Sequence, residues 1–100
     1  MINIVLFCAG GMSTSLLANK MREAAKEREL EVIVEAYPLS QIEVVGPLAD
    51  IVLLGPQIRH QKNKVEKVLP GKPMEIIDMT AYGMIDGKRV INQVCVALGI

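Results

Sequence analysis

One stretch near the start of the chain decides its fold: Ile2-Asn3-Ile4-Val5-Leu6-Phe7-Cys8-Ala9-Gly10-Gly11-Met12-Ser13-Thr14-Ser15. Its first part, residues 2–7, is a nearly uninterrupted apolar run, which is typical of a central parallel strand covered on both faces. The run leads into a cysteine and a loop of small residues, and an amphipathic helical pattern follows from about Leu16. We therefore predict a strand, a tight loop and a helix N-terminus in direct succession.

This junction has the features of an anion-binding site. Amide N–H groups of such a loop and of the first helical turn have no partner within the helix, and the helix dipole adds partial positive charge. Gly10 and Gly11 allow successive N–H groups to converge, while the three hydroxyls that follow add donors, or one of them, Thr14 or Ser15, caps the helix. The same field favours Cys8 as a thiolate. Cys8 is thus a candidate nucleophile that takes up a phosphoryl group.

Composition restricts the class of protein. A chain of 100 residues is expected to form a single domain, residues 1–100, and although 51% of it is hydrophobic, no apolar run approaches the roughly 20 residues that span a bilayer. The start has neither the charged region nor the cleavage site of a secretory signal, so we expect a cytoplasmic location. Two distant cysteines and one histidine give no metal-ligand spacing and no disulfide framework, so no metal and no cofactor are expected.

The charge pattern argues against nucleic-acid binding. Eleven basic residues balance eleven acidic ones, and only 3% of the chain is aromatic, so a basic surface with stacking platforms is missing. One local basic excess occupies residues 59–64. It fits either a solvated helix face or a docking patch for an acidic partner.

Strand and helix patterns alternate along the whole chain. Residues 2–7 and 50–54 fit inner strands, whereas residues 31–37 and 74–78 are half polar and fit the edges of a sheet. Helical patterns cover residues 16–29, a short segment that opens with a capping box at Ser40 and ends at Gly46-Pro47, residues 59–69, and residues 87–98 with Asp86 as N-cap.

Four strands that alternate with four helices predict an α/β fold. Long crossovers favour a four-stranded parallel sheet with helices on both faces, in three layers, and we predict strand order 2-1-3-4. In that order the switch point lies between strands 1 and 3, and ligands bind beyond their carboxyl ends. Cys8 follows one of these strands and Gly55-Pro56-Gln57 follows the other. Cys95, by contrast, falls on the apolar stripe of the last helix and is expected to be a buried structural residue.

The spacing after Cys8 resembles the Cys-x5-Arg loop of low-molecular-weight tyrosine phosphatases. Here the arginine position, six residues after the cysteine, is Thr14, so the guanidinium that stabilises the transition state is absent. The Asp-Pro pair that supplies the general acid is missing as well, since none of Asp50, Asp78 and Asp86 precedes a proline. Efficient hydrolysis therefore has no support, and a cradle that holds a phosphoryl group and passes it on fits better.

Three segments together closely resemble the IIB component of the lactose/cellobiose (chitobiose) class of the bacterial sugar phosphotransferase system. They are Ile4 to Ser15, Leu53-Leu54-Gly55-Pro56-Gln57-Ile58-Arg59, and Ile77-Asp78-Met79 with Tyr82-Gly83-Met84. The resemblance implies a phosphocysteine relay. Cys8 would accept the phosphoryl group from a phosphohistidine of subunit IIA and donate it to a cellobiose-, chitobiose- or lactose-type sugar held by membrane subunit IIC.

The same assignment predicts which residues surround the phosphoryl group. Its oxygens would be bound by Ala9, Gly10, Gly11, Met12, Ser13, Thr14 and Ser15. Further contacts with the phosphate or with a partner protein would come from Gln57, Arg59, Tyr82 and Met84. Met12 and Ile85 are additional candidates for an uncharged docking rim, with ordinary packing as the alternative.

Two other functions compete with the carrier. One is a cysteine-dependent low-molecular-weight phosphatase or arsenate reductase that uses the same loop. The other is a non-enzymatic module in which Cys8 is structural and the glycine loop binds a nucleotide or flavin.

Overall fold

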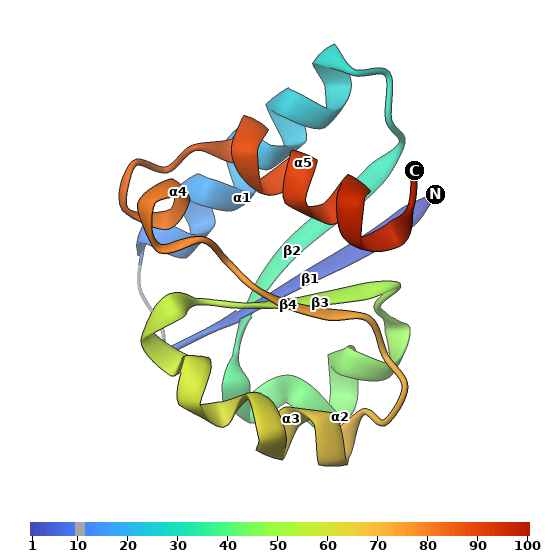
Figure 1. The fold of residues 1–100 in the computed structure, drawn as a ribbon, viewed down its shortest axis with the longest axis vertical. Helices are drawn as coiled ribbons and strands as arrows, with labels where there is room; N and C mark the ends of the chain where they lie inside the picture. The colour runs from blue at the N-terminus through green and yellow to red at the C-terminus, as the bar shows by residue number, and fades with distance from the viewer. Residues whose placement is uncertain (10–11) are drawn as a thin grey trace.

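A four-stranded sheet of order β2-β1-β3-β4 forms the centre of the computed structural model, which describes residues 1–9 and 12–100 (Figure 1). All three strand pairs are parallel. The strands are β1 (Ile2–Cys8), β2 (Val32–Pro38), β3 (Ile51–Leu54) and β4 (Met74–Ile76). The predicted strand order and α/β class are confirmed.

Strand β1 occupies the middle of this sheet. It pairs with β2 along its whole length and with β3 from Ile4 to Phe7, so Phe7 lies opposite both Tyr37 and Leu54. Every residue of β3 is buried, as is β1 from Ile4 to Cys8, whereas β2 and β4 keep partly exposed side chains. The two uninterrupted apolar runs are therefore the inner strands, as their composition predicts.

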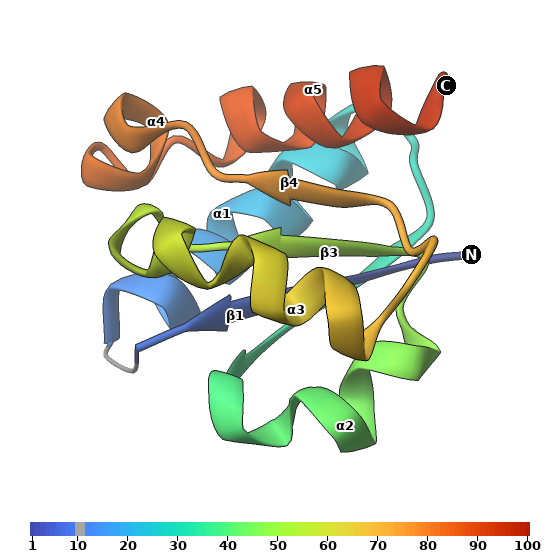
Figure 2. The same ribbon diagram turned by 60° about the horizontal axis from the view of Figure 1, so that its bottom comes forward.

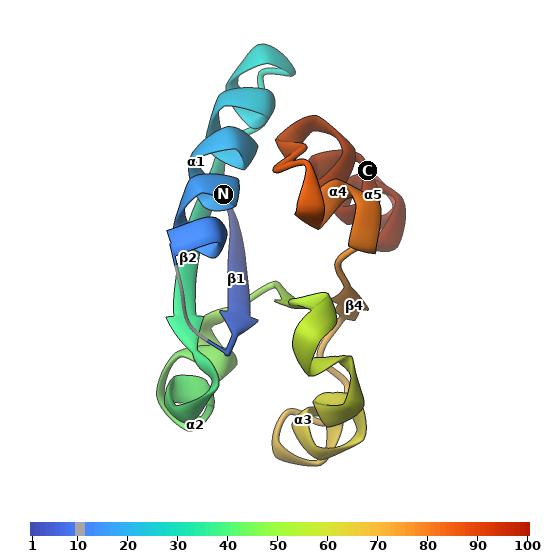
Figure 3. The ribbon, with the colours of Figure 1, turned by 90° about the vertical axis from the view of Figure 1, so that its left-hand side faces the viewer.

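Helices cover both faces of the sheet. They are α1 (Met12–Glu27), α2 (Ile42–Val45), α3 (Lys62–Val68), α4 (Met79–Gly83) and α5 (Gly87–Leu98), with 3-10 turns at Leu39–Gln41, Gly46–Leu48 and Pro56–Gln61. Figures 2 and 3 show α1, α4 and α5 on one side of the sheet and α2 and α3 on the other. The predicted three-layer arrangement is confirmed.

Each face of the sheet has its own hydrophobic core because side chains alternate along β1. Ile4 and Leu6 point to the side of α1 and α5, where they pack with Met21. Val5 and Phe7 point to the side of α2 and α3. One strand therefore anchors both helical layers.

Helix boundaries differ from the sequence pattern at three N-termini. The helix expected from residue 59 is a 3-10 turn over Pro56–Gln61 followed by α3, which begins at Lys62. Helix α1 begins at Met12, before its apolar stripe starts, so Thr14 and Ser15 lie inside the helix and the prediction that one of them is its N-cap is wrong. The capping box at Ser40 is also wrong. Ser40 lies within a 3-10 turn that continues directly from β2, and α2 begins after Gln41 without a side-chain cap.

Aspartate side chains cap the N-termini of the last two helices. The Asp86 carboxylate accepts a hydrogen bond from the Arg89 N–H (3.2 Å), as predicted for the N-cap of α5. The Asp78 carboxylate accepts one from the Ala81 N–H (2.9 Å) and caps α4, a helix that is absent from the four predicted by the sequence pattern. Helix α4 consists of five residues and has too few positions to show a helical period.

Helices α1 and α5 come into close contact at Gly87. A Cβ atom at Gly87 would lie 2.3 Å from the Lys20 carbonyl carbon and 2.5 Å from the Met21 nitrogen. These are backbone atoms, which cannot rotate away. The contact therefore requires the absence of a side chain.

We predict that Gly87→Ala lowers the free energy of unfolding by about 2 to 3 kcal/mol, because the added methyl overpacks a backbone-to-backbone contact. The matched control is Gly83→Ala in α4, where a Cβ meets nothing within 4 Å. Urea unfolding followed by circular dichroism measures both. Equal stability of the two variants would contradict the close contact.

Glu29 holds a left-handed backbone conformation at the end of α1, with φ of 57°. The Leu30 N–H donates to the Ala25 carbonyl (2.9 Å) and the Glu29 N–H to the Lys26 carbonyl (3.1 Å), the pattern of a Schellman C-cap. The end of α5 has the same pattern with Gly99 at that position, at φ of 71°. Glu29 thus occupies a position that favours glycine.

We predict that Glu29→Gly raises the free energy of unfolding by about 1 kcal/mol, since it relieves the left-handed strain of a residue with a Cβ. Gly99→Ala, the opposite change at the matched cap, should lower it by a similar amount. Chemical denaturation of both variants tests this, and a destabilised Glu29→Gly would be the contrary result.

Candidate functional site

Cys8 lies at the carboxyl end of β1, beside the residue that follows β3. The Gly55 N–H donates to the Phe7 carbonyl (2.9 Å), and a Cβ at Gly55 would lie 3.6 Å from the Cys8 Cβ. In Figure 2 the end of β1, the start of α1 and the turn after β3 lie together at the left of the molecule. The predicted meeting of Cys8 and Gly55 at the switch point is confirmed.

The N-terminus of α1 follows Cys8 after three residues. Its first turn contains no acidic residue, so no carboxylate of the turn competes with a bound anion for the positive end of the helix dipole. N–H groups in this turn have no intrahelical acceptor. Together these features suit an anion next to the Cys8 sulfur.

The predicted phosphate loop is described in part. Ala9 is exposed, and so is Ser15 within α1. Gly10 and Gly11 lie outside the described residues, as do the side chains of Met12 and Ser13. Thr14 is only 1% exposed, and its Oγ1 lies 2.9 Å from the Tyr82 hydroxyl oxygen. The position that carries arginine in the phosphatase loop is thus a buried threonine, hydrogen-bonded to Tyr82 of α4.

Residues that follow β3 form a second part of the site. Gln57 is exposed, and its Oε1 would lie 3.0 Å from a Cβ at Gly55, so the amide lies against the glycine that contacts Cys8. Arg59 is exposed two residues later. An open hollow of about 290 Å³ is lined by Pro56, Gln57, Arg59, Met79, Tyr82 and Gly83.

This hollow brings together three of the four predicted contact residues outside the loop. Gln57, Arg59 and Tyr82 line it, while Met84 lies beyond the end of α4 and is 74% exposed. Met79 was not a sequence candidate, yet it lines the hollow and is 62% exposed. The sequence feature that could have identified Met79 is Asp78, because an aspartate N-cap places Met79 at the start of a helix.

The rim candidate Ile85 has a different environment. It is partly buried against the core of α1 and α5. Its backbone is left-handed, with φ of 53°, in the turn that joins α4 to α5. At least part of its side chain therefore serves packing.

All three aspartates have structural contacts. Asp78 caps α4 and pairs with Arg89 (3.6 Å), and Asp86 caps α5. Asp50 precedes β3, at the end of the sheet opposite Cys8, and accepts from the Asn3 N–H (2.7 Å). Asp78 and Asp86 thus serve as helix caps, and Asp50 lies at the far end of the sheet from Cys8.

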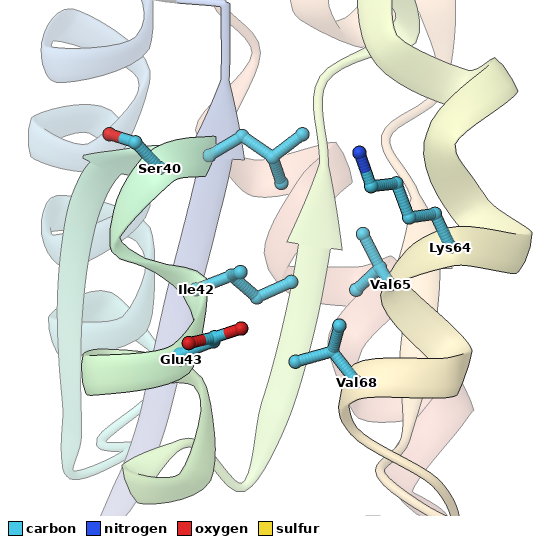
Figure 4. A pocket seen from close by; sticks show the side chains of 7 residues that line it. Ser40, Ile42, Glu43, Lys64, Val65 and Val68 are labelled. Atoms are coloured by element: carbon cyan, nitrogen blue, oxygen red, sulfur yellow. The ribbon is translucent and has the colours of Figure 1, made fainter.

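A second hollow, of about 420 Å³, lies between α2 and α3 (Figure 4). Its walls are apolar, from Ile42, Val65 and Val68, with Glu43 and Lys64 as the charged residues among them. None of the described residues that line it comes from the Cys8 junction. The described residues that line it include no cysteine.

Residues 1–9 and 12–100 offer neither a metal-ligand cluster nor a membrane-spanning helix. This part of the chain contains no group of three or more His, Cys, Asp or Glu that could hold a metal ion. None of its helices is long and apolar enough to cross a membrane. Cys95 is 3% exposed within the core of α1 and α5, the structural position that its apolar stripe predicts.

Comparison with known proteins agrees with the resemblance. A family model described as "PTS system, Lactose/Cellobiose specific IIB subunit" matches residues 3–93. The galactose-specific EIIB component of Lactococcus lactis subsp. cremoris is 40% identical over 95 residues, covering 88% of each chain. The oligo-beta-mannoside-specific EIIB component of Bacillus subtilis is also 40% identical, covering 93% of this chain and 92% of its own.

A solved structure has the same fold. The cellobiose-specific phosphotransferase IIB component from Borrelia burgdorferi superimposes with a TM-score of 0.78 at 35% identity. The match covers 96% of this chain and 90% of that one.

Proposed function

Because the chain belongs to the lactose/cellobiose-specific IIB family of the sugar phosphotransferase system, we propose that Cys8 is the residue that carries its phosphoryl group. Components of this type are phosphotransferases that work with a IIA subunit and a membrane IIC subunit. The observation that carries the proposal is the junction itself. Cys8 ends β1, and after three intervening residues α1 begins with a first turn that contains no acidic residue.

The proposed reaction has two substitutions at phosphorus. In the first, the Cys8 sulfur attacks the phosphohistidine of IIA, so an S–P bond forms and the P–N bond breaks. In the second, a sugar hydroxyl held by IIC attacks phosphorus, loses its proton to a base, and releases Cys8 as thiolate. The chain contributes positioning and charge stabilisation, chiefly through backbone N–H groups of residues 9–15.

Residues around the hollow would complete the site. We assign Gln57 and Arg59 to contacts with the phosphate or with a partner protein, because they line one hollow with Tyr82 and the Gln57 amide lies against Gly55, the neighbour of Cys8. The exposed side chains of Met79 and Met84 suit docking, since methionine adapts to more than one partner surface. A carrier that meets two partners in turn requires such a rim.

Hydrolysis is the less favoured outcome for the phosphoryl group. The buried Thr14 replaces the phosphatase arginine, and the aspartates Asp50, Asp78 and Asp86 have structural contacts. Without a guanidinium at that position and a general acid, water attack gains little help. The phosphoryl group should therefore persist until an acceptor arrives.

The proposed setting is the cytoplasm, with residues 1–100 as a single IIB-type domain. We propose a cellobiose-, chitobiose- or lactose-type sugar as the final acceptor, selected by the IIC subunit. Two relatives with equal identity to this chain are named for galactose and for oligo-beta-mannoside, which supports selection outside this chain.

We predict that incubation with phosphoenolpyruvate, the general phosphotransferase proteins and a lactose/cellobiose-class IIA adds one phosphoryl group, which intact-mass spectrometry detects. Cys8→Ser should abolish it, and Cys95→Ser should not, because Cys95 is a core residue of α5. Modification of comparable extent in Cys8→Ser would sink the assignment.

We further predict that turnover of a small aryl phosphate is negligible, because no arginine or general acid assists water. Release of the aryl alcohol, followed by absorbance, measures this. Turnover at the rate of a true phosphatase that disappears in Cys8→Ser would reject the carrier in favour of the hydrolase.

A further inference from the structure

We propose that Tyr82 is a positioning residue for phosphoryl transfer, and that it acts through its hydroxyl bond to Thr14 on the first turn of α1. The inference rests on the proposed function of Cys8 as phosphoryl acceptor. It assigns a role to a contact between residues that are 68 positions apart in the chain.

Thr14 makes the contact necessary. It is the third residue of α1 and is 1% exposed, the only buried polar residue among those whose side-chain exposure the structure describes. A buried hydroxyl without a partner is costly. The Tyr82 hydroxyl, 2.9 Å away, provides that partner, and Thr14 belongs to the turn whose N–H groups face the proposed phosphate.

Helix α4 holds Tyr82 firmly enough for this role. Asp78 caps the helix at the Ala81 N–H (2.9 Å) and pairs with Arg89 of α5 (3.6 Å). The Asp78 N–H donates to the Gln93 side-chain oxygen, also on α5 (3.3 Å). Helix α4 is therefore anchored to α5 at its first residues.

Contacts among α1, α4 and α5 form a closed circuit, in which each of the three helices contacts the other two. Helix α5 packs on α1 through Gly87, which lies against the backbone of Lys20. The turn between α4 and α5 is tight, with the Asp86 N–H donating to the Ala81 carbonyl (2.8 Å). The Thr14–Tyr82 bond closes this circuit at the N-terminus of α1, the one place where the circuit meets the Cys8 junction.

Loss of either hydroxyl should leave the fold intact but loosen this turn. Catalytic geometry is sensitive to small displacements of positioning groups. One neutral hydrogen bond corresponds to a rate effect of roughly three- to tenfold. Both single variants should show an effect of this size, because they delete the same interaction.

The test is a double-mutant cycle of Tyr82→Phe and Thr14→Val, with the phosphohistidine form of a lactose/cellobiose-class IIA as donor. Rapid-quench mass spectrometry measures kcat and KM for Cys8 phosphorylation. We expect each variant to lower kcat roughly three- to tenfold. KM for IIA should be unchanged, and the double variant should be no slower than the slower single one.

Two controls and one replacement variant accompany the cycle. Thr14→Ser keeps the hydroxyl and should retain most of the rate. Tyr37→Phe, at the only other tyrosine, removes a hydroxyl from a side chain packed on the opposite core and should have no effect. If Thr14→Val fails to fold, Thr14→Ala supplies the same deletion.

Specific results would overturn the inference. A slow Tyr82→Phe with a normal Thr14→Val would mean that Tyr82 touches the phosphate or the partner directly. Normal rates in both would remove any role for the bond while Cys8 phosphorylation stands. Failure of the wild-type protein to become phosphorylated on Cys8 would instead defeat the proposed function itself.

Discussion

The structure depends on the parallel pairing of β1 with strands on both of its sides. Seven register positions with β2 and four with β3 hold β1 at the centre of the sheet. Alternate side chains of this strand supply both hydrophobic cores. The same pairing places Cys8 at the carboxyl edge of the sheet, beside Gly55, so the strand that organises the fold also positions the proposed phosphoryl acceptor.

The two helical layers differ in what their described residues contribute to the structure around β1. On the side of α2 and α3 the described residues form a core and a largely apolar hollow whose lining does not include Cys8. On the side of α1, α4 and α5, the described contacts link the three helices to one another, and the Thr14–Tyr82 hydrogen bond reaches the first turn of α1. Gly87 permits the close contact of α1 with α5, and the Asp78 cap links α4 to that pair.

Chemistry follows from how the polar side chains are used. A hydrolase of related loop design needs a guanidinium and a general acid near the cysteine. Here a threonine replaces the arginine, and two of the three aspartates cap helices. Thr14 is bonded to Tyr82, while Asp78 and Asp86 cap helices. A phosphoryl group on Cys8 would face backbone N–H groups and a helix dipole, which stabilise its charge without activating water.

Local sequence patterns determined the parts of this protein that depend on neighbours in the chain. The apolar runs of β1 and β3, the stripe of α5 with Cys95, the Asp86 cap and the junction at Cys8 were all predicted, and so was the strand order, because parallel crossovers leave few alternatives. Tertiary structure alone decided the rest. Ser40, Thr14 and Ser15 fit helix caps by spacing, yet Ser40 continues a turn from β2, and Thr14 finds its partner on a helix too short to show a period. A hydroxyl selects its partner by proximity in space, and a contact across 68 residues leaves no periodicity in the sequence.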